Sequence, residues 1–138
     1  MKQMTVLTVL AIALLTFSGC AGLHPFQHDE KYNLDDQLEM VTQIQKYTMR
    51  DWQKVDSQSF VLQTGASNYY LIVLLHPSTE LMFAETIKIS STGAVVKSGF
   101  DKVTVYQAGR GQDYVIHKMY KFKDRQQMTE IKAQLTGK

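Results

Sequence analysis

Hydrophobic residues follow three different patterns along this chain, and the first is an unbroken run near the N-terminus. Residues 4–17 form a stretch of 14 without any charge, preceded by Lys2. As a helix this stretch would span about 21 Å, whereas the hydrocarbon core of a membrane is about 30 Å thick. The run therefore predicts the apolar region of an export signal rather than a membrane-spanning helix.

The second pattern is the 3.6-residue period of an amphipathic helix, which occurs twice. Residues 34–49 carry an apolar stripe, and Asn33 stands where a helix cap is favoured. A shorter stripe follows Asp124, a candidate N-cap. Gln127, three residues later, stands where its side chain can bond back to the start of the helix. The members of the two stripes are Leu34, Leu38, Val41 and Ile44, then Met128, Ile131 and Leu135. We expect one helix before the rest of the domain and one at its end.

Between these helices the hydrophobic period is two, which is typical of strands. Strand-like segments occur at residues 60–62, 69–75, 81–90, 94–97, 102–107 and 114–119, with turn residues between them. The segment 69–75 is apolar throughout and so predicts a central strand. The fold class that follows is α+β, with about six antiparallel strands in a curved sheet or small open barrel. We expect a single domain over residues 34–138.

The composition is that of a globular domain and argues against a nucleic-acid-binding protein. The chain has 138 residues, of which 44% are hydrophobic and 20% charged, as in an ordinary globular domain. A formal net charge of +2 gives no strong field, which argues against nucleic acid as a partner. Cys20 is the only cysteine, so an intrachain disulfide cannot form.

The end of the apolar run carries a further signal. The stretch Phe17-Ser18-Gly19-Cys20 resembles the lipobox of bacterial lipoproteins, although leucine is commonest where Phe17 stands. The resemblance implies removal of residues 1–19, transfer of a diacylglycerol to the Cys20 thiol, and a membrane partner through that anchor. Ala21, in place of an aspartate, favours the outer membrane facing the periplasm. The alternative is an ordinary secretory signal with an incidental cysteine.

Residues 20–33 are polar and aperiodic, which predicts a lipidated tether. His24, His28, Asp29 and Glu30 lie within it or at its end. They could ligate a metal only if held in fixed geometry, and Pro25 interrupts a helix that would hold them. We expect a solvated linker.

Several short stretches resemble a family of small exported bacterial proteins known only as a domain of unknown function. These stretches are residues 52–56, 77–84, 100–103 and 114–116. The resemblance implies a family disulfide between the position after Pro77 and the last strand. Here those positions hold Ser78 and Tyr114, so the chain lacks that disulfide. The resemblance implies no activity.

Candidate chemistry is sparse. His76, Glu80, Asp101 and His117 are weak catalytic candidates because carboxylates and histidines perform acid–base chemistry when they converge. Acids at turns, Asp56 among them, more often accept backbone N–H bonds. No nucleophile elbow, His-Glu-x-x-His or Cys-x-x-Cys motif is present, so neither a cofactor nor a metal is predicted.

Aromatic residues offer a second kind of candidate. Trp52, Tyr69, Tyr70 and Tyr106 could form a binding platform, but core packing is the commoner role, and we expect Trp52 in the core. The loop Gly109-Arg110-Gly111 is a basic tip that we expect to be solvated. The sequence therefore favours a membrane-anchored envelope lipoprotein that acts as a binding or accessory module. The alternative is a small envelope hydrolase using the carboxylate and histidine candidates.

Overall fold

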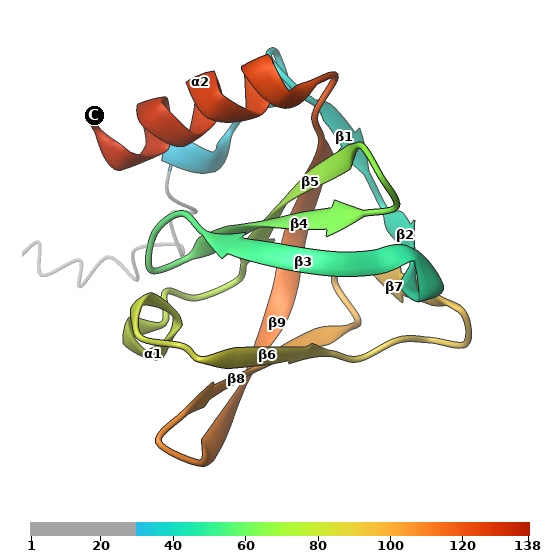
Figure 1. Cartoon of the computed structure of the whole chain (residues 1–138), viewed down its shortest axis with the longest axis vertical. Helices are drawn as coiled ribbons and strands as arrows, with labels where there is room; N and C mark the ends of the chain where they lie inside the picture. The colour runs from blue at the N-terminus through green and yellow to red at the C-terminus, as the bar shows by residue number, and fades with distance from the viewer. Residues whose placement is uncertain (1–29) are drawn as a thin grey trace, which may run out of the picture.

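A computed structural model describes residues 30–138, and its dominant feature is a strongly curled antiparallel sheet (Figure 1). Six strands follow one another across it in the order β3, β4, β5, β9, β8 and β6. Their bounds are Met49–Lys54, Ser59–Thr64, Asn68–Leu74, Arg110–Lys121, Lys102–Gln107 and Thr86–Ile89. The sheet curls into a half-barrel, which confirms the prediction of about six antiparallel strands. The fold is mostly β.

The strand β9 joins the two halves of this sheet. It is 12 residues long; its first half pairs with β8, and its second half pairs with β5 on one side and with β1 (Glu39–Val41) on the other. The register with β5 shifts between Val73 and Leu74. Such irregularities bend a strand and increase its twist, which helps one sheet to curl. Beside it, β2 (Gln43–Gln45) and β7 (Val95–Lys97) form a separate pair.

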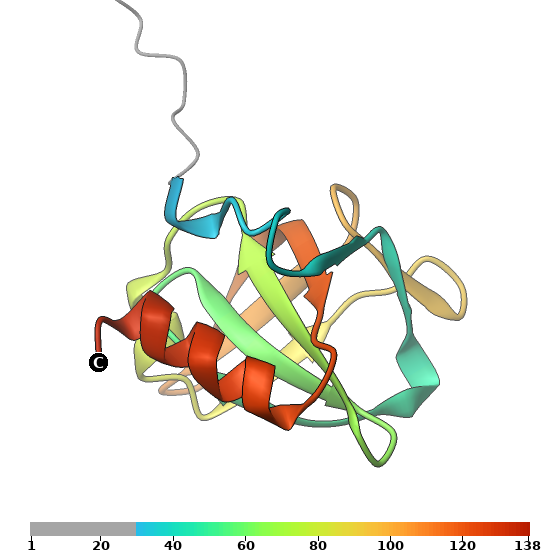
Figure 2. The same ribbon diagram turned by 90° about the horizontal axis from the view of Figure 1, so that it is seen from above.

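The C-terminal helix α2 (Arg125–Thr136) forms as the sequence predicts. The side chain of Asp124 accepts a hydrogen bond from the Gln127 N–H at 2.8 Å, and the Gln127 side chain accepts one from the Lys123 N–H at 2.7 Å. Gly137, in the left-handed conformation with φ of 68°, ends the helix. Figure 2 shows α2 lying across the outside of the sheet.

The sheet is buried on both faces, and this divides the core in two. The outer core lies under α2 and consists of Tyr32, Leu34, Leu38, Val55, Val61, Leu71, Val73, Tyr120, Phe122, Met128, Ile131 and Leu135. The inner core lies inside the half-barrel and consists of Ile44, Phe60, Leu62, Ile72, Leu74, Leu81, Ala84, Val96, Val103, Val105, Ile116 and Met119. Alternate residues of β4 and β5 belong to opposite cores, which is why segment 69–75 is apolar throughout.

The predicted helix over residues 34–49 is wrong. Only one helical turn forms, with the Leu38 N–H bonded to the Leu34 carbonyl at 2.8 Å, and the chain then extends into β1, β2 and the 3₁₀ turn η2 (Lys46–Thr48). Leu34, Leu38 and Ile44 are nevertheless buried. Pairing of β1 with β9 and of β2 with β7 overrides the local helical spacing, since tertiary contacts outweigh weak propensity.

One predicted strand is also shorter than expected. Residues 81–90 contain only β6, because α1 (Thr79–Met82) forms first, with Ser78 as its N-cap. A 3₁₀ turn, η1 (Glu30–Tyr32), precedes the strands. Within residues 30–138 no helix is both long and apolar enough to cross a membrane.

Candidate functional site

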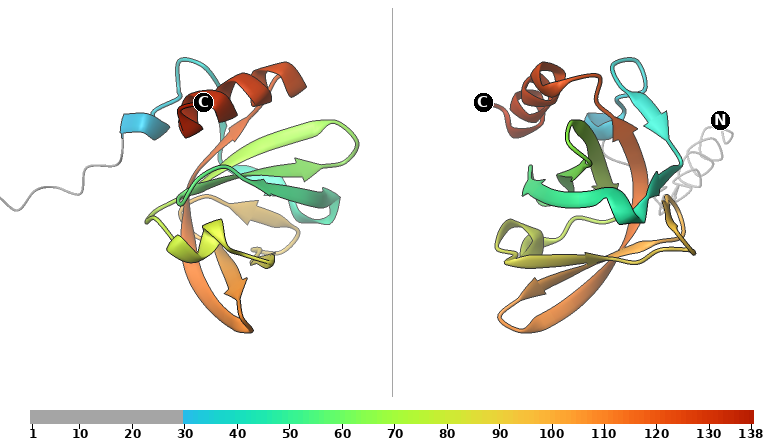
Figure 3. Two further views of the ribbon diagram at one scale, coloured as in Figure 1. Left: turned by 60° about the vertical axis from the view of Figure 1, so that its left-hand side comes forward. Right: turned by 45° about the vertical axis from the view of Figure 1, so that its right-hand side comes forward.

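The half-barrel is open between its two edge strands, and a pocket lies in that opening. The strands β3 and β6 end the six-strand order and face each other with no strand drawn between them (Figure 3). The pocket has a volume of about 280 Å³. We call it the seam pocket; its lining residues are Lys46, Met49, Arg50, Asp51, Trp52, Leu62, Ile87 and Ile89.

The interior of the seam pocket is apolar because three strands turn hydrophobic side chains toward it. Trp52, Ile87 and Ile89 are half-buried and pack against the inner core, and Leu62 beneath them is buried. The Trp52 ring meets Phe60 edge to face, with centroids 6.1 Å apart. Trp52 is thus neither fully buried, as the sequence predicted, nor fully exposed. One side of it packs on the core and it also lines an open pocket.

The rim of the seam pocket is charged. Arg50 stands where the register between β3 and β4 shifts, and Lys46 lies in η2 next to it. Both are exposed, and within residues 30–138 neither forms an ion pair. Asp51 also lies on the rim, but one of its carboxylate oxygens accepts the Trp52 N–H at 2.8 Å. The rim therefore carries two cations and one partly engaged acid.

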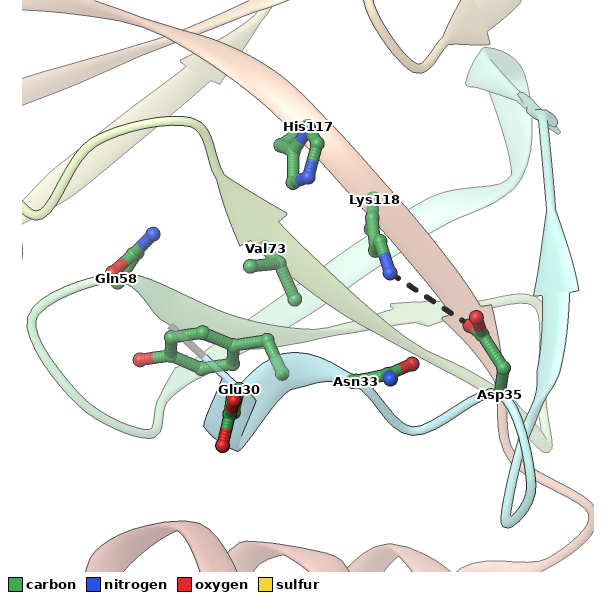
Figure 4. Close-up of a pocket in the computed structure, with 8 residues that line it drawn as sticks. Glu30, Asn33, Asp35, Gln58, Val73, His117 and Lys118 are labelled. Atoms are coloured by element: carbon green, nitrogen blue, oxygen red, sulfur yellow. Dashed lines mark ion pairs between the residues drawn. The ribbon is translucent and has the colours of Figure 1, made fainter. Parts of the chain in front are cut away.

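A second pocket of about 310 Å³, the outer pocket, lies near the point where the described chain begins (Figure 4). Its lining residues are Glu30, Tyr32, Asn33, Asp35, Gln58, Val73, His117 and Lys118. Lys118 pairs with Asp35 at 3.8 Å, and Asp35 also accepts the Tyr120 hydroxyl at 2.8 Å. Burial, together with this bond, raises the pKa of Tyr120 to about 12. The polar groups drawn together here attach the N-terminal segment to β9.

Asp101 serves the fold. The residue is 4% exposed, and its carboxylate accepts the Lys97 N–H and the Ser90 hydroxyl, both at 2.7 Å. Burial alone would raise the pKa of Asp101, but these donors and the Thr92 hydroxyl outweigh it and lower the pKa. Asp101 is thus a structural acceptor that fixes the approach to β8.

Asp56 has the same kind of role at the turn between β3 and β4. One of its oxygens accepts the Gln58 N–H and the hydroxyls of Tyr32 and Ser59 at 2.8–2.9 Å. The other lies 2.8 Å from Lys31 Nζ. Burial opposes ionisation, but these contacts outweigh it and lower the pKa of Asp56. The carboxylate ties the first described residues to the sheet.

Glu80 belongs to a third cluster, at the start of α1. It accepts the Tyr114 hydroxyl at 2.6 Å and the Ser78 hydroxyl at 3.1 Å. The bond from Tyr114 is the main reason that the pKa of Glu80 is lowered. Burial and the Glu80 carboxylate together raise the pKa of Tyr114. One carboxylate therefore links α1 to β9.

Comparison with known proteins gives one match. The family model described as "Family of unknown function (DUF6491)" matches residues 1–138. The chain belongs to this family. No curated protein and no solved structure matches. This confirms the resemblance to a domain of unknown function.

Ser78 and Tyr114 both donate to the same Glu80 oxygen. A hydrogen-bonded link thus joins α1 and β9.

The four catalytic candidates do not share a pocket. Glu80 and Asp101 belong to separate hydrogen-bonded clusters, His117 lines the outer pocket, and His76 is exposed at the end of β5. In the described part of the chain no group of three or more His, Cys, Asp or Glu side chains could hold a metal ion. Cys20, and the possible ligands His24, His28 and Asp29, lie outside the described residues.

The aromatic candidates also separate. Tyr69 packs against the outer core and Tyr70 against the inner core. Tyr106 lies beside Gly111, where an added Cβ would come within 2.9 Å of its ring. Arg110 and Gly109 are exposed at the hairpin tip. Only Trp52 lines the seam pocket, so the four do not form one platform.

Sequence reasoning missed most of the seam pocket. Lys46, Arg50, Ile87 and Ile89 come from segments far apart in the chain, and nothing local connects them. One available signal was Arg50. Its long cationic side chain lies in a segment with the two-residue hydrophobic period of a strand, and the same segment holds the only tryptophan.

Proposed function

We propose that this protein is a lipid-anchored envelope protein that binds a small ligand in the seam pocket. The observation that carries the binding role is the pocket itself: apolar inside, cationic at the rim and bordered by two edge strands. Ligand sites are commonly concave and apolar, with a few polar groups that set orientation. The mouth of a barrel is a recurrent place for such a site.

The anchoring role rests on the lipobox-like stretch ending at Cys20 and on the export signal before it. Two or three acyl chains would hold a protein stably on a membrane, since one chain binds only marginally. In this proposal the tether predicted for residues 20–33 is shortened to 20–29, because Lys31 and Tyr32 are bound to the domain, and it holds the half-barrel on the periplasmic side of the outer membrane. The seam pocket would then sample molecules close to that surface.

The alternative, a small envelope hydrolase, has less support. Its best observation is that His117 shares the outer pocket with Asp35 and Lys118. However, Glu80 and Asp101 each accept bonds that hold elements of the fold together. A carboxylate held ionised by structural donors is a poor proton donor near neutral pH.

Anchoring is tested by fractionating cells that express the wild-type chain or the Cys20→Ser variant. The wild-type protein is expected in the membrane fraction and to incorporate labelled palmitate. The variant is expected in the soluble fraction with an unchanged circular dichroism spectrum. A variant that stays with the membrane would contradict the anchoring role.

Binding is tested with octanol, a neutral single-chain probe, added to the exported Cys20→Ser chain. Trp52 is the only tryptophan, so its fluorescence reports on the seam pocket. We expect a saturable blue shift. Ile89→Asn, which places an amide in the pocket, should weaken it, whereas Lys88→Gln, on the opposite face of β6 beside Tyr106, should not. An unchanged spectrum, or equal shifts in both variants, would contradict binding in this pocket.

A further inference from the structure

We propose that the ligand of the seam pocket is a free single-chain amphiphile with an anionic head group, of the fatty acid class. This inference rests on the proposed binding function and adds the chemistry of the ligand. It depends on three features: an apolar interior, a rim with two cationic side chains against one carboxylate, and a small volume.

The apolar interior is confined to one end of the seam. The first residues of β3 and the last of β6 line the pocket. Toward the other end of β3, Lys54 Nζ donates to the Met82 carbonyl oxygen at 2.8 Å, which joins β3 to the end of α1. A ligand chain would therefore lie in an open apolar groove at one end of the seam. Burial of each methylene there stabilises the complex.

The charge at the rim favours an anion. Lys46 and Arg50 are exposed, within residues 30–138 neither pairs with a carboxylate, and together they outnumber the single carboxylate of Asp51 on the same rim. The register shift in β3 occurs at Arg50, and irregularities of this kind often redirect a side chain toward a functional site. An arginine fork binds a carboxylate with two parallel hydrogen bonds, and a lysine adds a point charge.

The volume selects among anionic amphiphiles. About 280 Å³ lies just below the range of roughly 300–1,000 Å³ that is usual for drug-sized ligands. One medium-length chain fits such a space, whereas the two chains of an intact phospholipid do not. This volume favours a free single-chain molecule over an intact phospholipid.

The test compares three probes that share one chain and differ in head group: octanoate, octanol and octylammonium. Each is titrated into the exported Cys20→Ser chain below its micelle-forming concentration, with Trp52 fluorescence and calorimetry as readouts. We expect octanoate to bind roughly three- to tenfold more tightly than octanol, as one or two exposed ion pairs would give. Octylammonium should bind most weakly, and added salt should reduce the preference for octanoate.

Two double variants assign that preference to the rim. Lys46→Gln with Arg50→Gln should bring octanoate and octanol to nearly equal affinity, because the charges that distinguish the two head groups are gone. Lys123→Gln with Arg125→Gln, which removes the same charge at the start of α2, should keep the preference. Equal affinity of the Cys20→Ser chain for octanoate and octanol would overturn this inference but leave the binding function standing. Failure of all three probes to bind would overturn both.

Discussion

The hydroxyl of Tyr120 holds the N-terminal segment against the sheet, and its removal gives the clearest test of the fold. Tyr120 is fully buried in the outer core. Its oxygen lies 3.0 Å from the Tyr32 carbonyl oxygen, 2.8 Å from Asp35 Oδ1 and 3.4 Å from the Leu34 nitrogen. Tyr120→Phe deletes this one oxygen and leaves the ring in place.

The expected loss follows from the groups left behind. The Leu34 N–H loses its buried acceptor, and an unsatisfied buried group costs about 1–3 kcal/mol. The single hydroxyl hydrogen goes to Asp35, the nearer of its two acceptors, and the half-exposed Asp35 side chain recovers water, so that loss adds little. We therefore expect Tyr120→Phe to lower the free energy of unfolding by about 1–3 kcal/mol, a large share of the 5–15 kcal/mol typical of a domain.

Urea unfolding of the Cys20→Ser chain, followed by circular dichroism, measures this loss as a lower midpoint at unchanged slope. Alkaline pH gives a second readout. Because the pKa of Tyr120 is raised from 10 to about 12, its contribution to stability is complete below pH 10 and is lost as the pH rises to 12. The difference between wild type and variant should shrink over that interval.

Tyr69→Phe is the matched control. Tyr69 also packs against the outer core, but its hydroxyl makes no hydrogen bond within residues 30–138. Its removal should change the unfolding free energy by less than about 0.5 kcal/mol. Equal losses in the two variants, or a difference that is constant up to pH 12, would refute the role assigned to the Tyr120 hydroxyl.

Two further predictions concern the buried Asp101 and the N-terminal boundary of the domain. Asp101→Asn should lower the unfolding free energy by about 2–4 kcal/mol, because an amide N–H would face donors now bonded to the carboxylate. Because the pKa of Asp101 is lowered, its contribution to the unfolding free energy is complete above pH 3.8 and is lost as the pH falls below that value. In urea titrations the unfolding free energy of the variant should therefore fall less steeply with acid than that of the wild type. An equally steep fall in both proteins would contradict this. A chain beginning at Leu34 should be less stable in thermal melts than one beginning at Glu30, by about 3–5 kcal/mol, since it lacks the buried Tyr32 and the Lys31–Asp56 pair. Both fragments should melt cooperatively and be indifferent to reductant, and equal stability would place the domain boundary at residue 34.

Features set by neighbouring residues could be predicted from the sequence. The cap at Asp124 and the stripe of Met128, Ile131 and Leu135 define α2, because capping and helical period involve residues only three or four apart. The alternation in residues 102–107 gives β8 with the predicted bounds. The unbroken apolar run at 69–75 predicts β5 as a central strand, since a strand buried on both faces has no polar face.

Features that need partners from distant parts of the chain could not be predicted. The spacing of Leu34, Leu38 and Ile44 satisfies a helix locally, but β1 and β2 find their partners only in β9 and β7. Trp52 was expected in the core because it follows the predicted helix over residues 34–49 and precedes the first predicted strand, a corner that packing would bury; that helix does not form, and Trp52 lies in the edge strand β3. Whether the barrel closes between β3 and β6 depends on the curl of the whole sheet. The tertiary structure alone therefore decided that Lys46, Arg50, Ile87 and Ile89 meet around one pocket, because sequence periodicity records which way a residue faces and not what faces it.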